Sequence, residues 1–366
     1  MNGLPALDDI QQAADAIYAY LDPTPQINWP LLDQLCGIEV WVKHENHLPT
    51  GSFKVRGGIW YVENKVSART TCNNAIQENM TQDKGELQER TQEERTQEER
   101  TQEERTRAKP AQAKANAGLI AATRGNHGQS IAFAARKHKL PVLIVVPEGN
   151  NQEKNAAMDA FGANLIVHGR DFDEAKKHAE KLAEQNALLM VPSFDPLLVA
   201  GVATYALELF TKAPPLDCVY VPIGLGSGIC GVIAARDALG LTTDVVGVVS
   251  SNANAYQQSF QAGKKCTTLS AATIADGLAV RTPDDRALAE IIAGAARIVD
   301  VTEDEITDAM KTLFVATHNL AEGAGAASLA ALIKEKNSLQ ARAKKPRCAI
   351  ILSGGNVAWD LFNRLP

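Results

Sequence analysis

The sequence predicts an α/β protein built from open, doubly wound, mostly parallel sheets. Short apolar runs alternate with helical stretches, and several runs are apolar on both alternating faces, which is typical of strands covered on both sides by helices. In such sheets ligands bind beyond the carboxyl ends of the strands, where this chain has glycine-rich turns. The predicted strands are residues 38–43, 118–122, 142–146, 164–167, 187–191, 218–222, 245–249, 298–301 and 349–352.

The first predicted element is a helix over residues 8–21, where apolar side chains recur at helical spacing. Asp22-Pro23 ends this helix, and Pro23-Thr24-Pro25 forces an extended segment. A chain of 366 residues is longer than one domain usually is, so we expect two domains.

Composition excludes several classes of partner. The net charge of −6 argues against binding to nucleic acid or to an anionic membrane. The six cysteines form no C-x-x-C pair, and no run of 18 apolar residues or signal peptide occurs. We therefore expect a cytoplasmic protein with free thiols.

One polar tract, residues 67–116, interrupts the alternation of strands and helices. The pentapeptide Thr-Gln-Glu-Glu-Arg occurs three times in succession from Thr91 to Arg105. Five residues advance a helix by about 140° beyond a full turn, so the repeat cannot form an apolar stripe. We expect a solvated insertion without a catalytic role, as a single helix or disordered; a partner-binding arm is the alternative.

Residues 44–58 form a polar turn between a predicted strand and a helix. The turn breaks at Pro49 and Gly51 and puts Lys54 at the start of the helix. Unpaired N–H groups at a helix start suit an anionic ligand, and a lysine amine held there can form a Schiff base with a carbonyl cofactor. A capping turn with a solvated lysine is the alternative for this turn alone.

A second turn spans residues 121–130. Gly125 and Gly128 allow the backbone to approach a ligand closely, and Asn126 offers both a donor and an acceptor. The start of the following helix favours a carboxylate or a phosphate, although a capped turn without a ligand fits the same residues. His127 has no second ligand at metal spacing, so we predict no zinc site.

A third turn, residues 224–231, follows a strand and opens a helix. Its three glycines and a serine within five residues can cradle a phosphate. Gly226-x-Gly228-x-x-Gly231 also matches a dinucleotide fingerprint, which keeps a nicotinamide-dependent oxidoreductase as an alternative. That fingerprint requires an acidic residue at the end of the next strand, but this strand ends Val249-Ser250-Ser251.

A fourth glycine turn, Ser353-Gly354-Gly355-Asn356, follows the last predicted strand, and lesser turns lie at 275–280 and 322–326.

Taken together, these motifs resemble those of the fold type II pyridoxal-phosphate enzymes, most closely the threonine/serine dehydratase (threonine ammonia-lyase) branch. The resemblance covers the whole chain except the insertion. It implies a fold like that of the tryptophan synthase β-subunit and a homodimer. It also implies a large cofactor-binding domain of residues 1–58 and 193–366 and a small domain of residues 59–192. The matching motifs, in the family's order, are Ser52-Phe53-Lys54-Val55-Arg56-Gly57, Gly125-Asn126-His127-Gly128-Gln129, the loop at 224–228 and Ser353-Gly354-Gly355-Asn356.

The resemblance also implies roles for individual residues. Lys54 would hold pyridoxal 5′-phosphate and remove the α-proton of the substrate, Phe53 would back the pyridine ring, and Ser353 would face the ring nitrogen. A neutral hydroxyl there makes the ring a weaker electron sink than a carboxylate would, which favours β-elimination. The phosphate would be bound by Gly224, Leu225, Gly226, Ser227 and Gly228, the cofactor 3′-oxygen by Asn126, and the substrate carboxylate by Thr123, Asn126 and His127.

The activity that the resemblance implies is a β-elimination that converts L-threonine or L-serine into 2-oxobutanoate or pyruvate and ammonia. Arg124 stands where many members have a small residue, and a serine there is the second acid/base of the family's racemases. Arg124 therefore disfavours serine racemase and suggests hydroxyaspartate, or another substituted 3-hydroxy amino acid, as an alternative substrate. Val249 and Ala255 occupy positions where metal-activated relatives have acidic ligands, so we expect no metal site there.

Overall fold

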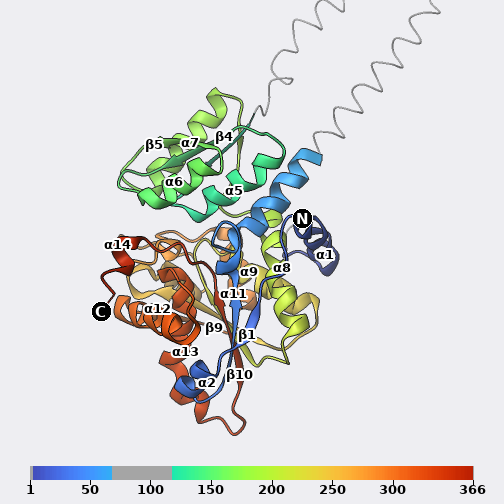
Figure 1. The fold of residues 1–366 in the computed structure, drawn as a ribbon, viewed down its shortest axis with the longest axis vertical. Helices are drawn as coiled ribbons and strands as arrows, with labels where there is room; N and C mark the ends of the chain where they lie inside the picture. The colour runs from blue at the N-terminus through green and yellow to red at the C-terminus, as the bar shows by residue number, and fades with distance from the viewer. Residues whose placement is uncertain (1–2, 68–117, 366) are drawn as a thin grey trace, which may run out of the picture.

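The computed structural model describes residues 3–67 and 118–365, so the polar insertion expected at 67–116 lies, except for residue 67, outside the described residues. Figure 1 shows two lobes stacked along the long axis, each built around its own sheet. Both ends of the chain lie on the larger, lower lobe. No helix in the described ranges is both long and apolar enough to cross a membrane.

The large lobe contains a six-stranded sheet of order β1-β2-β10-β7-β8-β9. Only β1 runs antiparallel to its neighbour, and the other pairs are parallel. The sequence predicted an extended segment at Pro23-Thr24-Pro25 but not the strand β1 that follows it. The strands are β1 (Gln26–Asn28), β2 (Glu39–His44), β7 (Cys218–Pro222), β8 (Asp244–Ser250), β9 (Arg297–Val301) and β10 (Arg347–Leu352).

The small lobe contains a four-stranded parallel sheet of order β5-β4-β3-β6. All nine predicted strands are therefore present, and the predicted α/β class with two parallel sheets is confirmed. The exact domain bounds stay a prediction. The strands of this sheet are β3 (Leu119–Ala122), β4 (Val142–Val146), β5 (Ala163–Val167) and β6 (Leu189–Met190).

Helices cover both faces of the large sheet. Alternate residues of its strands contribute to two separate apolar cores, as a doubly wound sheet requires. One core is formed with α2 (Pro30–Cys36), α12 (Glu303–Thr317) and α13 (Gly323–Gln340), and the other with α8 (Pro196–Lys212), α9 (Ser227–Ala238), α10 (Ala255–Ala262) and α11 (Asp285–Gly294). Three short segments are 3₁₀ helices: η1 (Glu45–His47), η2 (Ser251–Ala253), which comes directly after β8, and η3 (Asp276–Leu278). A short helix, α14 (Trp359–Phe362), lies near residue 365.

The small sheet is covered in the same way. A helix over 54–67, α5 (Asn126–Lys137) and α6 (Gln152–Ala160) pack on one face, and α1 (Leu7–Tyr18), which packs against α8, adds side chains to the same apolar core. The other face packs against α7 (Phe172–Gln185). The chain crosses from the large lobe to the small lobe through the helix over 54–67 and returns through α8 (Figure 1).

Candidate active site

The four turns singled out in the sequence open into one cavity of about 370 Å³ between the two lobes. Three of them follow the carboxyl ends of β2, β7 and β10 of the large sheet, and the fourth follows β3 of the small sheet. This volume lies in the range of small-molecule sites. All predicted site residues line the cavity: Phe53, Lys54, Thr123, Arg124, Asn126, His127, Gly224, Leu225, Gly226, Ser227, Gly228 and Ser353.

The turn that carries Lys54 is fixed to the last strand of the sheet. The Phe53 backbone N–H donates to the Ser353 carbonyl at 3.1 Å, and Ser52 forms a bridge with Gly354. The helix begins at Lys54 immediately after this contact. Two motifs about 300 residues apart in the sequence are therefore hydrogen-bonded neighbours.

The Lys54 amine lies inside the cavity. Its Nζ donates to the Ser227 hydroxyl at 2.8 Å and lies 5.0 Å from the centre of the Phe53 ring. Desolvation by the surrounding protein lowers the pKa of Lys54 to about 8. This amine is much closer to neutrality at physiological pH than a solvated lysine, as a nucleophile or a base must be.

The loop after β7 has the shape of an anion cradle. Gly226 is the N-cap of α9 with φ +100°, and a Cβ there would lie 2.6 Å from the Cβ of Ala287. Only glycine fits this conformation and this space. The first N–H groups of α9 have no partner within the helix, so the loop presents donors to the cavity beside Ser227.

The turn after β3 is held by its own side chain. The Thr123 hydroxyl accepts from the backbone N–H of Gly125 at 2.9 Å, so it stabilises the turn in addition to lining the cavity. His127 is buried, and no partner for its Nε2 occurs among residues 3–67 and 118–365. Burial and the nearby charge of Lys54 lower the pKa of His127 to about 3, so the imidazole is neutral.

A chain of polar contacts joins the two lobes at the cavity wall. Asn356 Nδ2 donates to Asn126 Oδ1 at 2.8 Å, and Asn126 Nδ2 donates to Glu322 at 2.6 Å. Lys154 Nζ lies 3.2 Å from Glu322 and 3.3 Å from Asp276. Burial alone would lower the pKa of Lys154, but these two carboxylates outweigh it and raise the pKa. Both polar atoms of the Asn126 side-chain amide are thereby oriented.

Sequence reasoning did not select Lys154, Asp276 or Glu322 as site residues. Asp276 and Glu322 belong to the lesser turns at 275–280 and 322–326, so a signal for them was present. Lys154 lies within α6, where nothing in the sequence distinguishes it from a solvated lysine. Its neighbour Arg124 is half-exposed, with Nη1 3.7 Å from Asp276.

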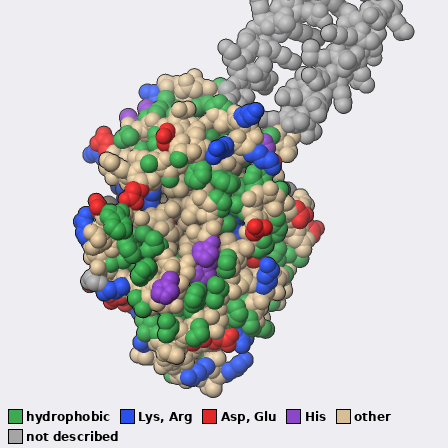
Figure 2. Space-filling model, in the orientation of Figure 1, with side chains coloured by type: hydrophobic (Ala, Val, Ile, Leu, Met, Phe, Trp, Pro, Cys, Tyr) green, Lys and Arg blue, Asp and Glu red, His purple; other side chains and the backbone are tan. Residues whose placement is uncertain are grey.

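A second contact between the lobes lies at the rim of the cavity. Arg281, which follows η3, pairs with Asp171 at 3.1 Å and with Asp173 at the start of α7. On the face that Figure 2 shows, charged side chains of both signs are mixed and no large patch of one sign forms. No group of three or more potential metal ligands occurs in the part of the chain that the structure describes.

Comparison with known proteins identifies the family. A sequence family described as pyridoxal-phosphate dependent enzyme matches residues 95–354, well over half of the chain. The chain belongs to the pyridoxal-phosphate-dependent enzymes. The L-threonine ammonia-lyase of Thermotoga maritima is 30% identical over 360 residues, which cover 98% of this chain and 77% of that protein. The chain is thus a pyridoxal-phosphate-dependent enzyme related to threonine ammonia-lyases.

Solved structures support the same fold. The T.th. threonine deaminase superposes with a TM-score of 0.77 at 27% identity, covering 97% of this chain and 99% of that one. Maize serine racemase superposes with a TM-score of 0.80 at 22% identity, covering 100% and 97%. The second likeness concerns the fold alone. Fold type II, predicted from the four motifs, is confirmed.

The residues present fit pyridoxal 5′-phosphate. The cavity offers a desolvated lysine amine, and that amine lies beside a glycine-lined helix start suited to a phosphate. Nε2 of His127 has no partner among the described residues and is a polar atom that a ligand can use.

Proposed function

We propose that this enzyme removes ammonia from a 3-hydroxy amino acid by eliminating water and then hydrolysing the resulting enamine, with L-threonine and L-serine as substrates and 2-oxobutanoate and pyruvate as products. The observation that supports this most strongly is the Lys54 amine, desolvated and 2.8 Å from the Ser227 hydroxyl at the start of α9. The names of the T. maritima and T.th. relatives also favour threonine. Membership of the pyridoxal-phosphate family favours this activity over the nicotinamide-dependent alternative.

Several residues would hold the cofactor. Lys54 would bind it covalently, the N–H groups of residues 224–228 would bind its phosphate, and Phe53 would pack against its ring. Asn126 would hydrogen-bond to the 3′-oxygen of the cofactor and Ser353 would face its ring nitrogen, and both residues line the cavity. When bound, pyridoxal 5′-phosphate supplies the carbonyl that accepts the substrate amine and the ring that withdraws electrons from its α-carbon.

Lys54 would also act as the base. A pKa of about 8 leaves a useful neutral fraction of the amine at physiological pH, so Nζ can accept the α-proton of the substrate. The Ser227 hydroxyl accepts a hydrogen bond from Nζ and keeps the amine directed at the cavity. Removal of the α-proton and loss of the β-hydroxyl as water leave an enamine, which hydrolyses to the 2-oxo acid and ammonia.

The substrate carboxylate would lie at the start of α5. The helix N-terminus attracts an anion, and His127 sits in its first turn as a neutral donor or acceptor. The contacts of Asn126 with Asn356 and Glu322 hold its amide at the same place. The two lobes together would therefore fix the α-carbon of the substrate relative to Lys54.

Hydroxyaspartate, or another substituted 3-hydroxy amino acid, is the second candidate substrate. Arg124 lines the cavity, and its nearest carboxylate, Asp276, lies 3.7 Å away, beyond hydrogen-bonding distance. A distal carboxylate on the substrate would form a closer pair. Against this, Asp276 and Glu322 already balance Arg124 and Lys154, so a further anion would leave the cluster negative. We therefore place threonine and serine first.

Reduction and mass spectrometry test the cofactor assignment. Purified protein loaded with pyridoxal 5′-phosphate should absorb in the visible range, and borohydride should leave the cofactor mass on the peptide that contains Lys54. An adduct on another lysine, or no adduct, would refute the role of Lys54.

A substrate comparison tests the activity. Ammonia and 2-oxo acid release from threonine, serine and 3-hydroxyaspartate should be measured for the parent enzyme and for Arg124→Ala. We expect release from threonine and serine, with little change in Arg124→Ala. A preference for 3-hydroxyaspartate that disappears in Arg124→Ala would reverse the order of the two candidates.

A further inference from the structure

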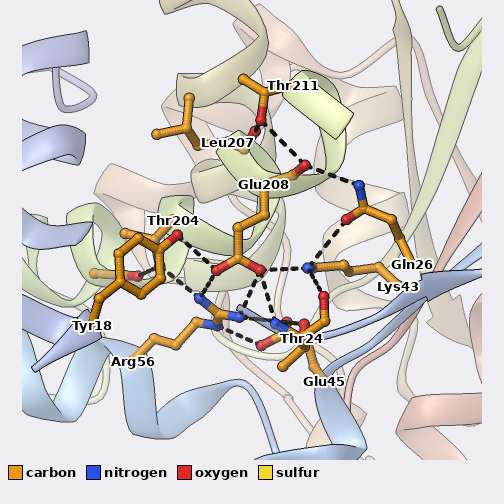
Figure 3. Close-up of polar contacts among 11 residues, drawn as sticks. Tyr18, Thr24, Gln26, Lys43, Glu45, Arg56, Thr204, Leu207, Glu208 and Thr211 are labelled. Carbon is orange, nitrogen blue, oxygen red and sulfur yellow. Dashed lines mark hydrogen bonds and ion pairs between the residues drawn. The ribbon is translucent and has the colours of Figure 1, made fainter. Parts of the chain in front are cut away.

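A cluster of charged side chains is buried beside Lys54 but outside the cavity. Arg56, Glu45 and Lys43 are completely buried, and Glu208 is 3% exposed. These residues come from β2, η1, the first turn of the helix over 54–67 and α8 (Figure 3). None of them lines the cavity, so none would touch a substrate held there.

Arg56 is the centre of this cluster. Its Nε donates to Glu45 at 2.7 Å, and its Nη1 donates to Glu208 at 2.6 Å and to the Thr204 hydroxyl at 3.1 Å. Nη2 donates to Glu45, Glu208 and the Thr24 hydroxyl (Figure 3). Every nitrogen of the guanidinium is therefore engaged, in a geometry that a lysine ammonium cannot reproduce.

The other contacts in the cluster provide further hydrogen-bond donors to the Glu208 carboxylate. Lys43 Nζ donates to Glu208 and to the Thr24 carbonyl, and the Tyr18 hydroxyl donates to Glu208 at 2.9 Å. Burial alone would raise the pKa of Glu208, but the charges and hydrogen bonds of Arg56 and Lys43 together outweigh it and hold the pKa below its ordinary value. Two cations thus face two anions, and the cluster is neutral.

This cluster ties together the two segments through which the chain passes between the lobes. Arg56 lies on the outgoing segment, and Thr204 and Glu208 lie on the returning helix α8. The segments also touch through their backbones, because a Cβ on Gly201 would lie only 2.6 Å from the Arg56 carbonyl oxygen. The junction of the lobes is therefore fixed at Arg56, two residues beyond Lys54.

Stability alone is a weak reason for such a cluster. Burying four charges costs desolvation energy that their mutual attraction roughly repays, and apolar replacements of buried ion pairs are often as stable. The charged groups, unlike apolar packing, form directional hydrogen bonds that hold the first turn of the helix over 54–67 in one orientation. That turn also determines where the Cα of Lys54 lies relative to Ser227.

We propose that Arg56, held by Glu45, Glu208 and Thr204, is a positioning residue that fixes the Lys54 amine against the loop at 224–228. The inference rests on the proposed function, because it concerns Lys54 as the cofactor-bearing base. Lys54 follows β2 of the large sheet, whereas Asn126 and His127 follow β3 of the small sheet.

The test compares Arg56→Lys with Arg297→Lys in the cofactor-loaded enzyme. Arg297 forms a similar partly buried pair with Glu335 and also contacts the Tyr220 hydroxyl, but it lies at the amino end of β9, at the edge of the sheet opposite the cavity. Three quantities are measured for each variant: the thermal midpoint, kcat and KM for the amino acid, and the pH midpoint of the visible absorbance of the cofactor–lysine linkage.

Both variants should lose thermal stability. Only Arg56→Lys should shift the absorbance midpoint and lower kcat by about 10- to 100-fold with KM little changed, as a small misplacement of a reacting group does. Equal absorbance midpoints and equal kcat in the two variants would overturn the proposal. Thr204→Val removes one hydrogen bond to Arg56 and should give a smaller shift of the same sign. It decides the question if Arg56→Lys does not fold.

The borohydride experiment on the parent enzyme distinguishes failure of the positioning role of Arg56 from failure of the proposed function. If borohydride places the cofactor on Lys54 but Arg56→Lys behaves like Arg297→Lys, the positioning role is wrong and the proposed function stands. If the parent shows no adduct on Lys54, the proposed function fails and the positioning role fails with it.

Discussion

Replacing Lys54 by methionine should stabilise the cofactor-free protein while abolishing turnover. Methionine is similar in length and apolar, so it fills the space of the lysine stem without a charge. The pKa of Lys54 is lowered from 10.5 to about 8 by burial, which corresponds to about 3 kcal/mol of unfavourable free energy for the protonated amine. Loss of the hydrogen bond to Ser227 offsets about 1 kcal/mol. The net gain is about 2 kcal/mol, or roughly 3 °C in thermal midpoint for a chain of this length.

The gain should depend on pH in a defined direction. Below pH 8 the amine is protonated in both the folded and the unfolded protein, so the full cost of burial is present. Between about pH 8 and 10.5 the folded protein has lost the proton that the unfolded chain keeps, and the cost shrinks. Above that range the amine is neutral in both states, and Lys54→Met should lose its advantage.

Urea unfolding of cofactor-free protein at pH 7 and pH 10 measures this difference. Lys212→Met is the matched control, because Lys212 is an exposed lysine in the last turn of α8. It should show no pH-dependent gain. Equal stability of Lys54→Met and the parent at pH 7, or an equal gain at both pH values, would refute the argument that burial lowers the pKa of Lys54.

Three further variants test other parts of the site. Gly226→Ala forces a Cβ into a left-handed residue 2.6 Å from Ala287, so cofactor affinity measured by absorbance titration should fall about tenfold or more; unchanged affinity would contradict the cradle. Lys154→Met leaves the buried Glu322 carboxylate without its cation and should cost about 3 kcal/mol in urea unfolding, and a loss below about 1 kcal/mol would show that the pair is dispensable. His127→Asn should lower kcat/KM without moving the acidic limb of its pH profile, because a pKa of about 3 keeps His127 neutral there; a moved limb would mean that the imidazole titrates in the working range.

Much of the fold could be predicted because two local patterns occur together in this sequence, short apolar runs and the glycine turns that bound them. Apolar runs such as 218–222 and 349–352 are bounded by glycine turns, and both became strands buried on two faces. The short β1 was missed as a strand because three residues after a proline carry too little pattern, and its pairing with β2 is a tertiary contact.

The site could be predicted only as far as its turns. Glycine and asparagine at a strand end identify a turn, and parallel strands bring such turns to one edge. Lys154 and Arg56 are different, because a charged residue within a helix looks the same whether it faces water or a buried carboxylate. Arg56 stood within the motif that carries Lys54, but its partners Glu45 and Glu208 become neighbours only in the folded chain.

The hydrogen bond between Phe53 and Ser353 has a consequence for how this protein folds. The strand before Lys54, β2, pairs in parallel with β10, which lies about 300 residues later in the sequence, so the turn that carries the amine has no fixed position until β10 has formed and paired. Closing so long a loop is entropically costly, and contacts between distant parts of a chain form slowly. The refolding protein should therefore bind pyridoxal 5′-phosphate late, after its helix content has recovered. The time course of cofactor binding would then measure when β10 pairs with β2.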